Sequence, residues 1–486
     1  MKNGVMLQAF EWNTEGGGTF YDRIRNQAAQ LAGAGFTALW LPPAFKGTSS
    51  LDVGYGTYDL YDLGEFNQKE ETRTKYGTKA QYLGCIRELK RHGLEVYADV
   101  VLNHKAGADG VELFRVVEVN RDNRTEVISD PFDIEGWTRF EFPGRGDRYS
   151  TFKWNFNHFS GVDYDRISNR GGIFKILGDN KDWSRDVSSE LGNFDYLMFA
   201  DVNTDHPDVR DELKRWSDWF IAETGVDGFR MDAVKHISAD FMRDFVEHVQ
   251  QQQGNQFYFV GEYWKPDSSE TNRYLYETNY DMDIFDVKLH FHFAEAAWRG
   301  AEYDLRTVFD NTVVREHPAL AVTFVDNHDS QPGQALESWV GEWFKPLAYA
   351  LILLRKDGYP CVFAGDYWGI NGDPDRTGFQ PEIDRLLRIR RQFLSGDQED
   401  RFDHPNLIGW IQHGDDQNPG KLATLVCTGN DEMHMRIEFG PTYAGRVFSD
   451  YSGRRSDKIT LDENGAADFP VSGRSYSVWG DQDFAN

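Results

Sequence analysis

The sequence has few cysteines and no long apolar segment, and each shortage excludes a class of protein. Cys85, Cys361 and Cys427 are odd in number and far apart, without a disulfide framework or CxxC metal spacing, so we expect free, mostly buried thiols. The best apolar run, Leu347 to Leu354, is too short to span a bilayer, and the first residues lack the apolar core of a signal peptide. These shortages predict a cytoplasmic protein with no membrane partner, or a secreted one if a leader has been removed.

Positive charge is also scarce. The chain has 52 Lys and Arg against 79 Asp and Glu, a formal net charge of −27. No basic run is long enough to track a phosphate backbone, so we expect no nucleic-acid partner. The acidic excess is explained by surface solubility, with salt adaptation as the alternative. Aromatic residues make up 15% of the chain, which suits a protein that offers flat apolar faces to a ligand, although most rings will belong to the core.

Short apolar runs, each followed by a helix-like stretch, recur eight times along the chain. This alternation is typical of βα units and a parallel sheet. The expected strands are residues 5–10, 37–41, 95–102, 228–232, 257–262, 284–289, 321–326 and 360–364. The expected helices lie near 20–33, 79–92, 208–223, 238–252, 268–279, 300–315, 342–356 and 382–394. Eight near-continuous apolar strands predict a closed (β/α)8 TIM barrel, an α/β fold, rather than an open doubly wound sheet.

Two further regions depart from this rhythm. About 100 residues after the third strand are rich in Gly, Asn, Asp and aromatics, and because so long a structureless loop is improbable, we expect an inserted β-rich domain. After Phe393 short alternating runs predict an all-β sandwich, with strands at 407–411, 423–427, 434–439, 446–450, 458–461 and 475–479. The predicted segments are barrel domain A (1–103), inserted domain B (104–206), the rest of domain A (207–395) and domain C (396–486).

Polar residues interrupt the apolar runs at four strand ends, where a barrel places its functional side chains. They are Asp99, Asn103 and His104 at the end of the third strand, Arg230, Asp232, Lys235 and His236 at the end of the fourth, Glu262 at the end of the fifth, and His328 and Asp329 at the end of the seventh. A lone Asp or Glu at such a place is more often a helix cap or a salt-bridge partner. Four strand ends together favour a catalytic site, while for Asp99 alone we favour a structural role.

The carboxylates suit a retaining glycosidase. Period-two alternation puts Arg230 and Asp232 on one face, so the guanidinium is expected to keep Asp232 ionised as a nucleophile. Glu262, behind an apolar run, is the better candidate for a protonated general acid. Retaining enzymes need this division between carboxyls about 5–5.5 Å apart. Asp329 would be a third carboxylate of the site, stabilising positive charge on the ring, and His104 and His328 would donate hydrogen bonds to sugar hydroxyls.

In order and residue type the four segments resemble the four sequence regions of the α-amylase superfamily, glycoside hydrolase family 13. The resemblance implies that Asp232 is the nucleophile, Glu262 the acid/base and Asp329 the transition-state stabiliser. It also implies substrate contacts from Arg230, His104, His328, Tyr55, Lys235 and His236. The stretches 7–12, 58–66 and 343–354 are most similar to those of bacterial liquefying amylases and their cytoplasmic relatives. The implied reaction is endo-hydrolysis of α-1,4-glucosidic bonds in starch, glycogen and related oligosaccharides.

The end of the inserted segment, residues 192–205, holds several oxygen donors and no Cys or His cluster, which favours Ca²⁺ over Zn²⁺. The resemblance implies one calcium, held by Asn103, Asp195, Asp201 and the backbone carbonyl of His236. Liquefying amylases often hold further metals through additional aspartates, and here Ser184 and Asn203 stand at two of those positions. We therefore expect one calcium and only a weak second site.

Several alternatives stay open at this stage. An exo-acting maltooligosaccharide hydrolase or a transglycosylase would share the covalent intermediate, and a non-catalytic glucan-binding relative would share the fold. Domain C either caps the barrel or carries a separate starch-binding surface. The expected partners are α-glucans alone, and we expect a monomer.

Overall fold

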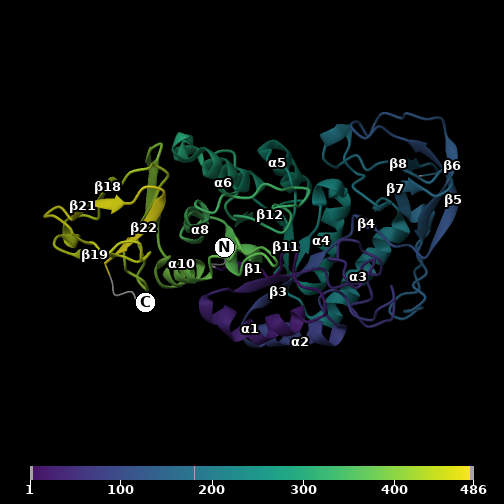
Figure 1. Ribbon diagram of the computed structural model, residues 1–486, viewed down its shortest axis with the longest axis horizontal. Helices are drawn as coiled ribbons and strands as arrows, with labels where there is room; N and C mark the ends of the chain where they lie inside the picture. The colour runs from purple at the N-terminus through teal and green to yellow at the C-terminus, as the bar shows by residue number, and fades with distance from the viewer. Residues whose placement is uncertain (1–3, 180, 482–486) are drawn as a thin grey trace. The chain divides into compact units, whose positions relative to one another are not determined.

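The computed structural model describes residues 4–179 and 181–481, and eight of its strands close into a parallel barrel (Figure 1). Their order around the barrel is β1-β14-β13-β12-β11-β10-β3-β2. The strands are β1 (Met6–Gln8), β2 (Ala38–Leu41), β3 (Glu95–Val100), β10 (Gly228–Met231), β11 (Tyr258–Gly261), β12 (Asp283–Phe285), β13 (Ala321–Phe324) and β14 (Tyr359–Phe363). The prediction of a closed (β/α)8 barrel is confirmed.

The chain divides into two compact units, and the division runs through the barrel sequence. The first unit comprises Met1–Asn13, Gln30–Thr37 and Asp286–Asn486, and the second comprises Thr14–Ala29 and Ala38–Phe285. The boundaries predicted for domains A, B and C stay predictions, because these units are not drawn along them.

The α-helices that lie wholly in the second unit each begin directly after a residue whose side chain caps them. They are α2 (Lys79–Arg91), α3 (Pro207–Thr224), α4 (Ala239–Gln253) and α5 (Ser268–Glu277), while α1 (Phe20–Ala34) contributes residues to both units. A capping box at Thr78 starts α2, and Gly225, at a left-handed φ of 67°, ends α3. In the barrel, β10 pairs with β3 so that Arg230 lies opposite Asp99. This register brings a cation and a carboxylate together inside the barrel.

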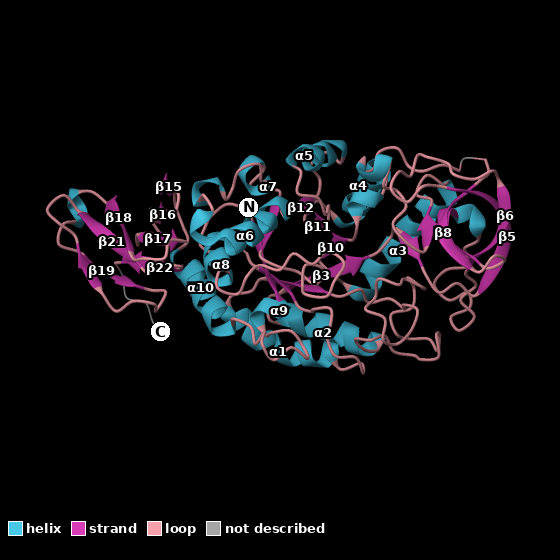
Figure 2. Cartoon of the chain, turned by 45° about the horizontal axis from the view of Figure 1, so that its top comes forward, coloured by secondary structure: helices cyan, strands magenta, loops and turns pink. Residues whose placement is uncertain are grey.

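The segment after β3 folds into an antiparallel sheet, visible as the magenta strands labelled β5, β6 and β8 in Figure 2. The strand order is β4-β9-β7-β8-β5-β6. These strands are β4 (His104–Lys105), β5 (Gly110–Glu118), β6 (Phe132–Arg139), β7 (Phe159–Asp165), β8 (Arg170–Ile176) and β9 (Ala200–Val202). A small core of Val119, Ile173, Trp183 and Tyr196 supports it. The expectation of a β-rich insertion is confirmed.

In the first unit, one strand and helix predicted from the sequence differ from the structure. The expected strand 284–289 ends at Phe285, because the Asp286 carboxylate accepts the Leu289 backbone N–H at 3.1 Å and caps a helix there. The sixth helix is therefore α6 (Val287–Arg299), and the helix expected at 300–315 is wrong; that stretch holds two 3₁₀ turns and the short α7 (Val313–Glu316). The remaining helices are α8 (Lys345–Leu353), α9 (Ala364–Tyr367) and α10 (Gln380–Phe393).

The C-terminal region is all-β, as predicted, with two strands that the sequence analysis missed. It holds a six-stranded sheet in the order β15-β16-β17-β22-β19-β20 and a β18-β21 pair. The strands are β15 (Gln398–His404), β16 (Leu407–Gln412), β17 (Leu422–Cys427), β18 (Met433–Glu438), β19 (Val447–Asp450), β20 (Lys458–Thr460), β21 (Ala466–Val471) and β22 (Ser475–Gly480). β15 and β21 were missed. Their core includes Leu425, Phe448, Phe469 and Trp479.

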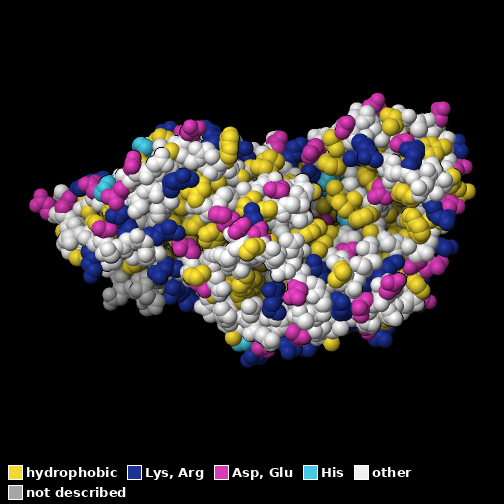
Figure 3. Space-filling model, in the orientation of Figure 1, with side chains coloured by type: hydrophobic (Ala, Val, Ile, Leu, Met, Phe, Trp, Pro, Cys, Tyr) yellow, Lys and Arg dark blue, Asp and Glu magenta, His cyan; other side chains and the backbone are white. Residues whose placement is uncertain are grey.

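The structure can be compared with the scarcity of cysteine, of long apolar segments and of positive charge in the sequence. Cys85, Cys361 and Cys427 are buried free thiols, as expected. No described helix has both the length and the apolar character needed to cross a membrane. On the face drawn in Figure 3, basic side chains are scattered among acidic ones, with no continuous basic area.

Candidate active site

Arg230 organises three carboxyl groups inside the second unit. Its guanidinium is fully buried; Nη1 lies 2.8 Å from Asp99 Oδ1 and 2.6 Å from Asp232 Oδ1, and Nη2 lies 2.8 Å from Glu262 Oε2. Asp99 and Asp232 accept Nη1–H hydrogen bonds. The structure therefore brings the predicted residues Arg230, Asp232 and Glu262 together, with the Arg230 guanidinium between the carboxyl groups.

Asp99 is the saturated member of this group. Its second oxygen accepts hydrogen bonds from Trp40 Nε1 at 3.0 Å and from the Tyr55 hydroxyl at 2.8 Å. Both oxygens of Asp99 are thus bound by protein donors, which fits the structural role expected for it. The part played by Trp40 was missed, because a tryptophan in an apolar strand gives no sign in the sequence that its indole N–H serves the site.

Asp232 and Glu262 each keep one oxygen without a protein donor. Glu262 Oε2 accepts the Ala233 backbone N–H at 3.3 Å, whereas the buried Oε1 has no hydrogen-bond partner in the described chain. Asp232 Oδ1 is bound to Arg230, and Oδ2 makes no hydrogen bond within the described residues. Within the described residues, Asp232 Oδ2 and Glu262 Oε1 are thus the two carboxyl oxygens available to a substrate.

The electrostatics of Asp232 differ from the prediction. Burial raises the pKa of Asp232 to about 8; Arg230 opposes the rise, and the Glu262 and Asp99 carboxylates add to it. Arg230 lowers the pKa of Asp232, as expected, but burial outweighs this effect, because one guanidinium serves three buried carboxyls.

A tight turn follows Asp232 and places the next two predicted residues. Ala233 has a left-handed φ of 50°, and Val234–His236 form a 3₁₀ turn. Lys235 Nζ then donates to the Trp264 carbonyl at 3.1 Å and to Glu190 Oε2 at 3.2 Å. The structure thus connects the ends of β10 and β11 through a lysine side chain.

His104 and Tyr55 also lie in the second unit and contact each other. His104 Nε2 donates to the Tyr55 carbonyl at 2.8 Å, and Asn103 Nδ2 lies 3.3 Å from His104 Nδ1. Burial lowers the pKa of His104 to about 4, so the ring is neutral at neutral pH. Because both ring nitrogens have partners in the chain, a sugar contact through His104 stays a prediction.

Asp329 and His328 belong to the first unit, at the end of β13. The Asn327 side-chain oxygen accepts the Asp329 backbone N–H at 2.9 Å and so holds the loop. His328 Nε2 lies 3.4 Å from Asp329 Oδ2, and Gln8 Nε2 lies 2.8 Å from His328 Nδ1. The contact from Gln8 was not foreseen, since a glutamine ending a strand has many possible partners.

An aromatic hollow of about 370 Å³ lies on the inserted sheet, directly after His104. It is lined by Lys105, Trp137, Val162, Tyr164, Phe199 and five further residues of the same segments. Trp137 and Phe199 are exposed, at 45% and 37%. Exposed rings beside polar groups suit the apolar faces and hydroxyls of sugars.

The predicted calcium ligands include two buried carboxylates without a basic partner among the described residues. Burial raises the pKa of Asp195 to about 8, and burial together with Asp195 raises that of Asp201 well above its usual range. Two adjacent buried acids of this kind suit a hard cation. The His236 ring donates from Nδ1 to the Phe194 carbonyl at 2.7 Å, which leaves its backbone carbonyl as the predicted donor.

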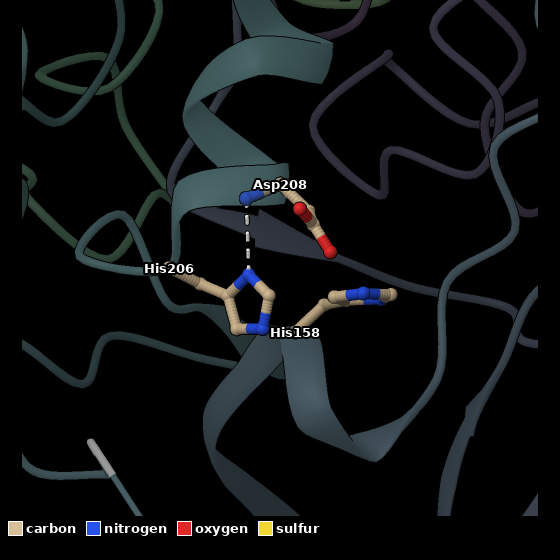
Figure 4. Close-up of side chains that lie close together, drawn as sticks. All are labelled: His158, His206 and Asp208. Carbon is tan, nitrogen blue, oxygen red and sulfur yellow. Dashed lines mark hydrogen bonds between the residues drawn. The ribbon is translucent and has the colours of Figure 1, made fainter.

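A separate group, His158, His206 and Asp208, lies close together at the start of α3 (Figure 4). His158 Nδ1 accepts the Asn155 backbone N–H at 3.1 Å, and His206 Nδ1 accepts that of Asp208 at 3.2 Å. With each Nδ1 lone pair used, the ring proton of each neutral histidine is on Nε2, where a metal would need a lone pair. These histidines act as backbone caps.

Comparison with known proteins identifies the family. Residues 21–401 match the family model "Alpha amylase, catalytic domain", and residues 424–480 match "Alpha-amylase C-terminal". The chain is 50% identical over 478 residues to an alpha-amylase of Geobacillus stearothermophilus, covering 98% of this chain and 87% of that protein. It is 48% identical to a glucan 1,4-alpha-maltohexaosidase of Bacillus sp. strain 707, covering 98% and 92%. It is 42% identical to the cytoplasmic alpha-amylase of Escherichia coli K12, covering 99% of each.

Solved structures agree at the level of the fold. The alpha-amylase of Geobacillus thermoleovorans complexed with acarbose superposes with a TM-score of 0.67 at 18% identity, covering 99% of this chain and 98% of that one. Together with the family models, these likenesses show that the chain belongs to the alpha-amylase family of glycoside hydrolases.

Proposed function

We propose that the enzyme hydrolyses internal α-1,4-glucosidic bonds of starch, glycogen and related oligosaccharides with retention of configuration. One observation carries the proposal: Arg230 binds one oxygen of Asp232 and one of Glu262, and the other oxygen of each has no donor among residues 4–179 and 181–481. A nucleophile and a general acid both need such an unbound oxygen.

In the first step Asp232 Oδ2 attacks the anomeric carbon and forms an ester to the sugar. The bond to the leaving oxygen breaks as Glu262 Oε1 gives that oxygen a proton. In the second step Glu262 removes a proton from water, the water oxygen attacks the same carbon, and Asp232 is released. Asp329 stabilises positive charge on the ring in both transition states. The two inversions give net retention.

The substrate is an α-glucan chain. We assign Tyr55, His104, His328 and Arg230 to the reacting ring, and Lys235 and His236 to the leaving side. The hollow on the inserted sheet, with Trp137 and Phe199 exposed, offers stacking faces for further sugars. Such a surface supports attack within long chains.

We assign one structural calcium to Asn103, Asp195, Asp201 and the His236 carbonyl. A bound calcium would neutralise the two buried acids and tie β9 to the segment that follows β3 and β10. Ser184 donates its backbone N–H to Asp195 Oδ2 at 3.1 Å and brings no charge of its own, so a second site is expected to be weak.

Calcium removal is therefore expected to lower the melting temperature and the activity together. At a calcium concentration of about 1,000 times the dissociation constant, the bound ion contributes ~4 kcal/mol to folding. Calorimetry after chelation, with calcium added back, measures this contribution. Metal analysis of the dialysed enzyme is expected to give one calcium per chain; two or more tightly held ions would contradict the single-site assignment.

The mode of attack is tested by a time course on labelled amylose and maltoheptaose. Endo attack gives long oligosaccharides early and a fast loss of iodine staining. Early accumulation of one short product would instead favour an exo-acting enzyme, a possibility raised by the maltohexaosidase relative. Products longer than the substrate would indicate transglycosylation. We place the enzyme in the cytoplasm, as the name of the Escherichia coli relative suggests, and cell fractionation tests that placement.

A further inference from the structure

His328 is held on three sides by residues that end or follow β1. The ring is buried, with 1% of its surface exposed. The Phe10 ring centroid lies 5.2 Å away, and the Trp12 ring lies 6.1 Å away and within 11° of parallel. On the ring edge, Gln8 Nε2 lies 2.8 Å from Nδ1. The orientation of the imidazole is therefore set by ring packing and by the contact with Gln8.

That contact also determines where the imidazole proton lies. An amide nitrogen only donates hydrogen bonds, so with the Gln8 amide in this orientation His328 Nδ1 accepts with its lone pair. The single proton of the neutral ring is then on Nε2. The other tautomer, or the imidazolium, would set two N–H groups against each other at 2.8 Å. Nε2 lies 3.4 Å from Asp329 Oδ2, so the nitrogen that carries the proton is next to that carboxylate.

Gln8 is a costly choice unless this contact has a purpose. Its side chain is 1% exposed, and its Oε1 has no hydrogen-bond partner in the described chain. A buried polar atom without a partner lowers the stability of the fold, a loss that a methionine or leucine of similar volume would avoid. Packing alone therefore does not explain a glutamine at this position.

We propose that Gln8 is a positioning residue that holds His328 as its Nε2–H tautomer, so that the ring presents a hydrogen-bond donor beside Asp329. The inference rests on the proposed function, in which His328 contacts the reacting sugar. A hydroxyl oxygen of that sugar accepts a hydrogen bond from Nε2–H, whereas the other tautomer would present a lone pair. Gln8 acts only through His328.

The first test reads the tautomer directly, without activity. Nitrogen chemical shifts of ¹⁵N-histidine-labelled enzyme, with His328 assigned by its loss in His328→Gln, are expected to show Nε2 protonated and Nδ1 unprotonated. In Gln8→Glu a carboxylate replaces the amide and accepts a hydrogen bond, so the Nδ1 signal is expected to become that of a protonated nitrogen. A protonated Nδ1 in the unaltered enzyme would overturn the proposal.

The second test measures the consequence for catalysis. Gln8→Glu is expected to lower kcat about 10- to 100-fold, with KM changed by less than about threefold, because a donor to the transition state is lost. In the His328→Gln background the same change is expected to cost less than about twofold, since residues that act through each other are not additive. An equal loss in both backgrounds would overturn the proposal.

Matched controls separate positioning from folding. Thr37→Val removes the hydrogen bond from Thr37 Oγ1 to the Val5 carbonyl, just before β1, and is expected to leave the tautomer and kcat unchanged. Gln8→Met keeps the volume, so a preserved melting temperature with reduced kcat supports positioning. If His328→Gln keeps full activity, the role of His328 under the proposed function fails, while the nitrogen shifts still decide the tautomer.

Discussion

Two buried ionic clusters lie at the ends of barrel strands, one in each unit, and only one leaves oxygens unbound. In the first unit Lys345 pairs with Asp366 and with Asp326, at 2.7 Å to Oδ2. The Ser330 hydroxyl donates to Asp326 Oδ1 at 2.8 Å, and the Tyr349 hydroxyl donates to Asp366 Oδ2 at 2.7 Å. All four carboxylate oxygens therefore have protein donors.

The Arg230 cluster of the second unit differs in how many of its carboxylate oxygens have donors. Both oxygens of Asp99 have donors, like those of the two acids beside Lys345, but Asp232 Oδ2 and Glu262 Oε1 have none in the part of the chain that the structure describes. Burial alone does not separate the two clusters, since burial also raises the pKa of Asp326 to about 8. The number of donors at each oxygen separates an acid that stabilises the fold from one available to a substrate.

The largest expected effect comes from Asp232→Asn. Removing the nucleophile is expected to lower kcat by about 10⁴-fold, measured with soluble starch. Because burial raises the pKa of Asp232 to about 8, the folded chain favours its neutral form, and this stability is lost as pH rises from ~4 towards 8. Asparagine stays neutral, so the melting temperature at pH 7 is not expected to fall. A large loss of stability with little loss of activity would show that Asp232 stabilises the fold and is not the nucleophile.

Lys345→Met reverses that pattern. It leaves Asp326 and Asp366 buried without their cation, which is expected to lower the free energy of unfolding by ~3–5 kcal/mol. Denaturant unfolding measures the loss. Well below the melting temperature, kcat is expected to change less than it does in Asp232→Asn. If the variant is as stable as the parent, the Lys345 cluster is not a structural element.

Glu262→Gln sharpens the comparison within the catalytic cluster. The amide cannot give up a proton, so kcat is expected to fall about 10²- to 10³-fold. A substrate whose leaving group needs no protonation, such as a nitrophenyl maltooligosaccharide, is expected to lose less in the first step. Equal losses for starch and for this substrate would contradict the role of general acid.

The smallest expected effect is a shift in pH dependence. The Asp99 carboxylate contributes to the raised pKa of Asp232, so Asp99→Asn is expected to lower that pKa. The acidic limb of the kcat/KM profile, where Asp232 must lose its proton, then moves to lower pH. A limb that stays in place or moves upward would show that Asp99 is not electrostatically coupled to the nucleophile.

The sequence predicted most of the fold because apolar runs and their periodicity are local signals. The eight strands and most helices follow from apolar runs and helix-like stretches. The exception is 284–289, an apolar run that was predicted as one strand. It contains the end of a strand and the start of a helix, which Asp286 caps. The strands β15 and β21 were missed since charged residues and prolines interrupt their alternation.

The site was predicted less completely. Residue types at strand ends brought Arg230, Asp232 and Glu262 to attention, and the structure places them together. The contacts of Trp40 and Gln8 depend on which strands are neighbours, so no local pattern reveals them. Nor does the sequence show that three acids share one guanidinium, so the rise that burial causes in the pKa of Asp232 was not foreseen.

The buried thiols make the enzyme convenient for labelling. Burial raises the pKa of Cys85 and of Cys361 to about 12, so neither forms the reactive thiolate at neutral pH, and Cys427 is buried as well. A cysteine introduced at an exposed position would therefore react with a maleimide almost alone. Ile167, 60% exposed on the inserted sheet, is a suitable position for a dye that reports glucan binding without prior removal of the native cysteines.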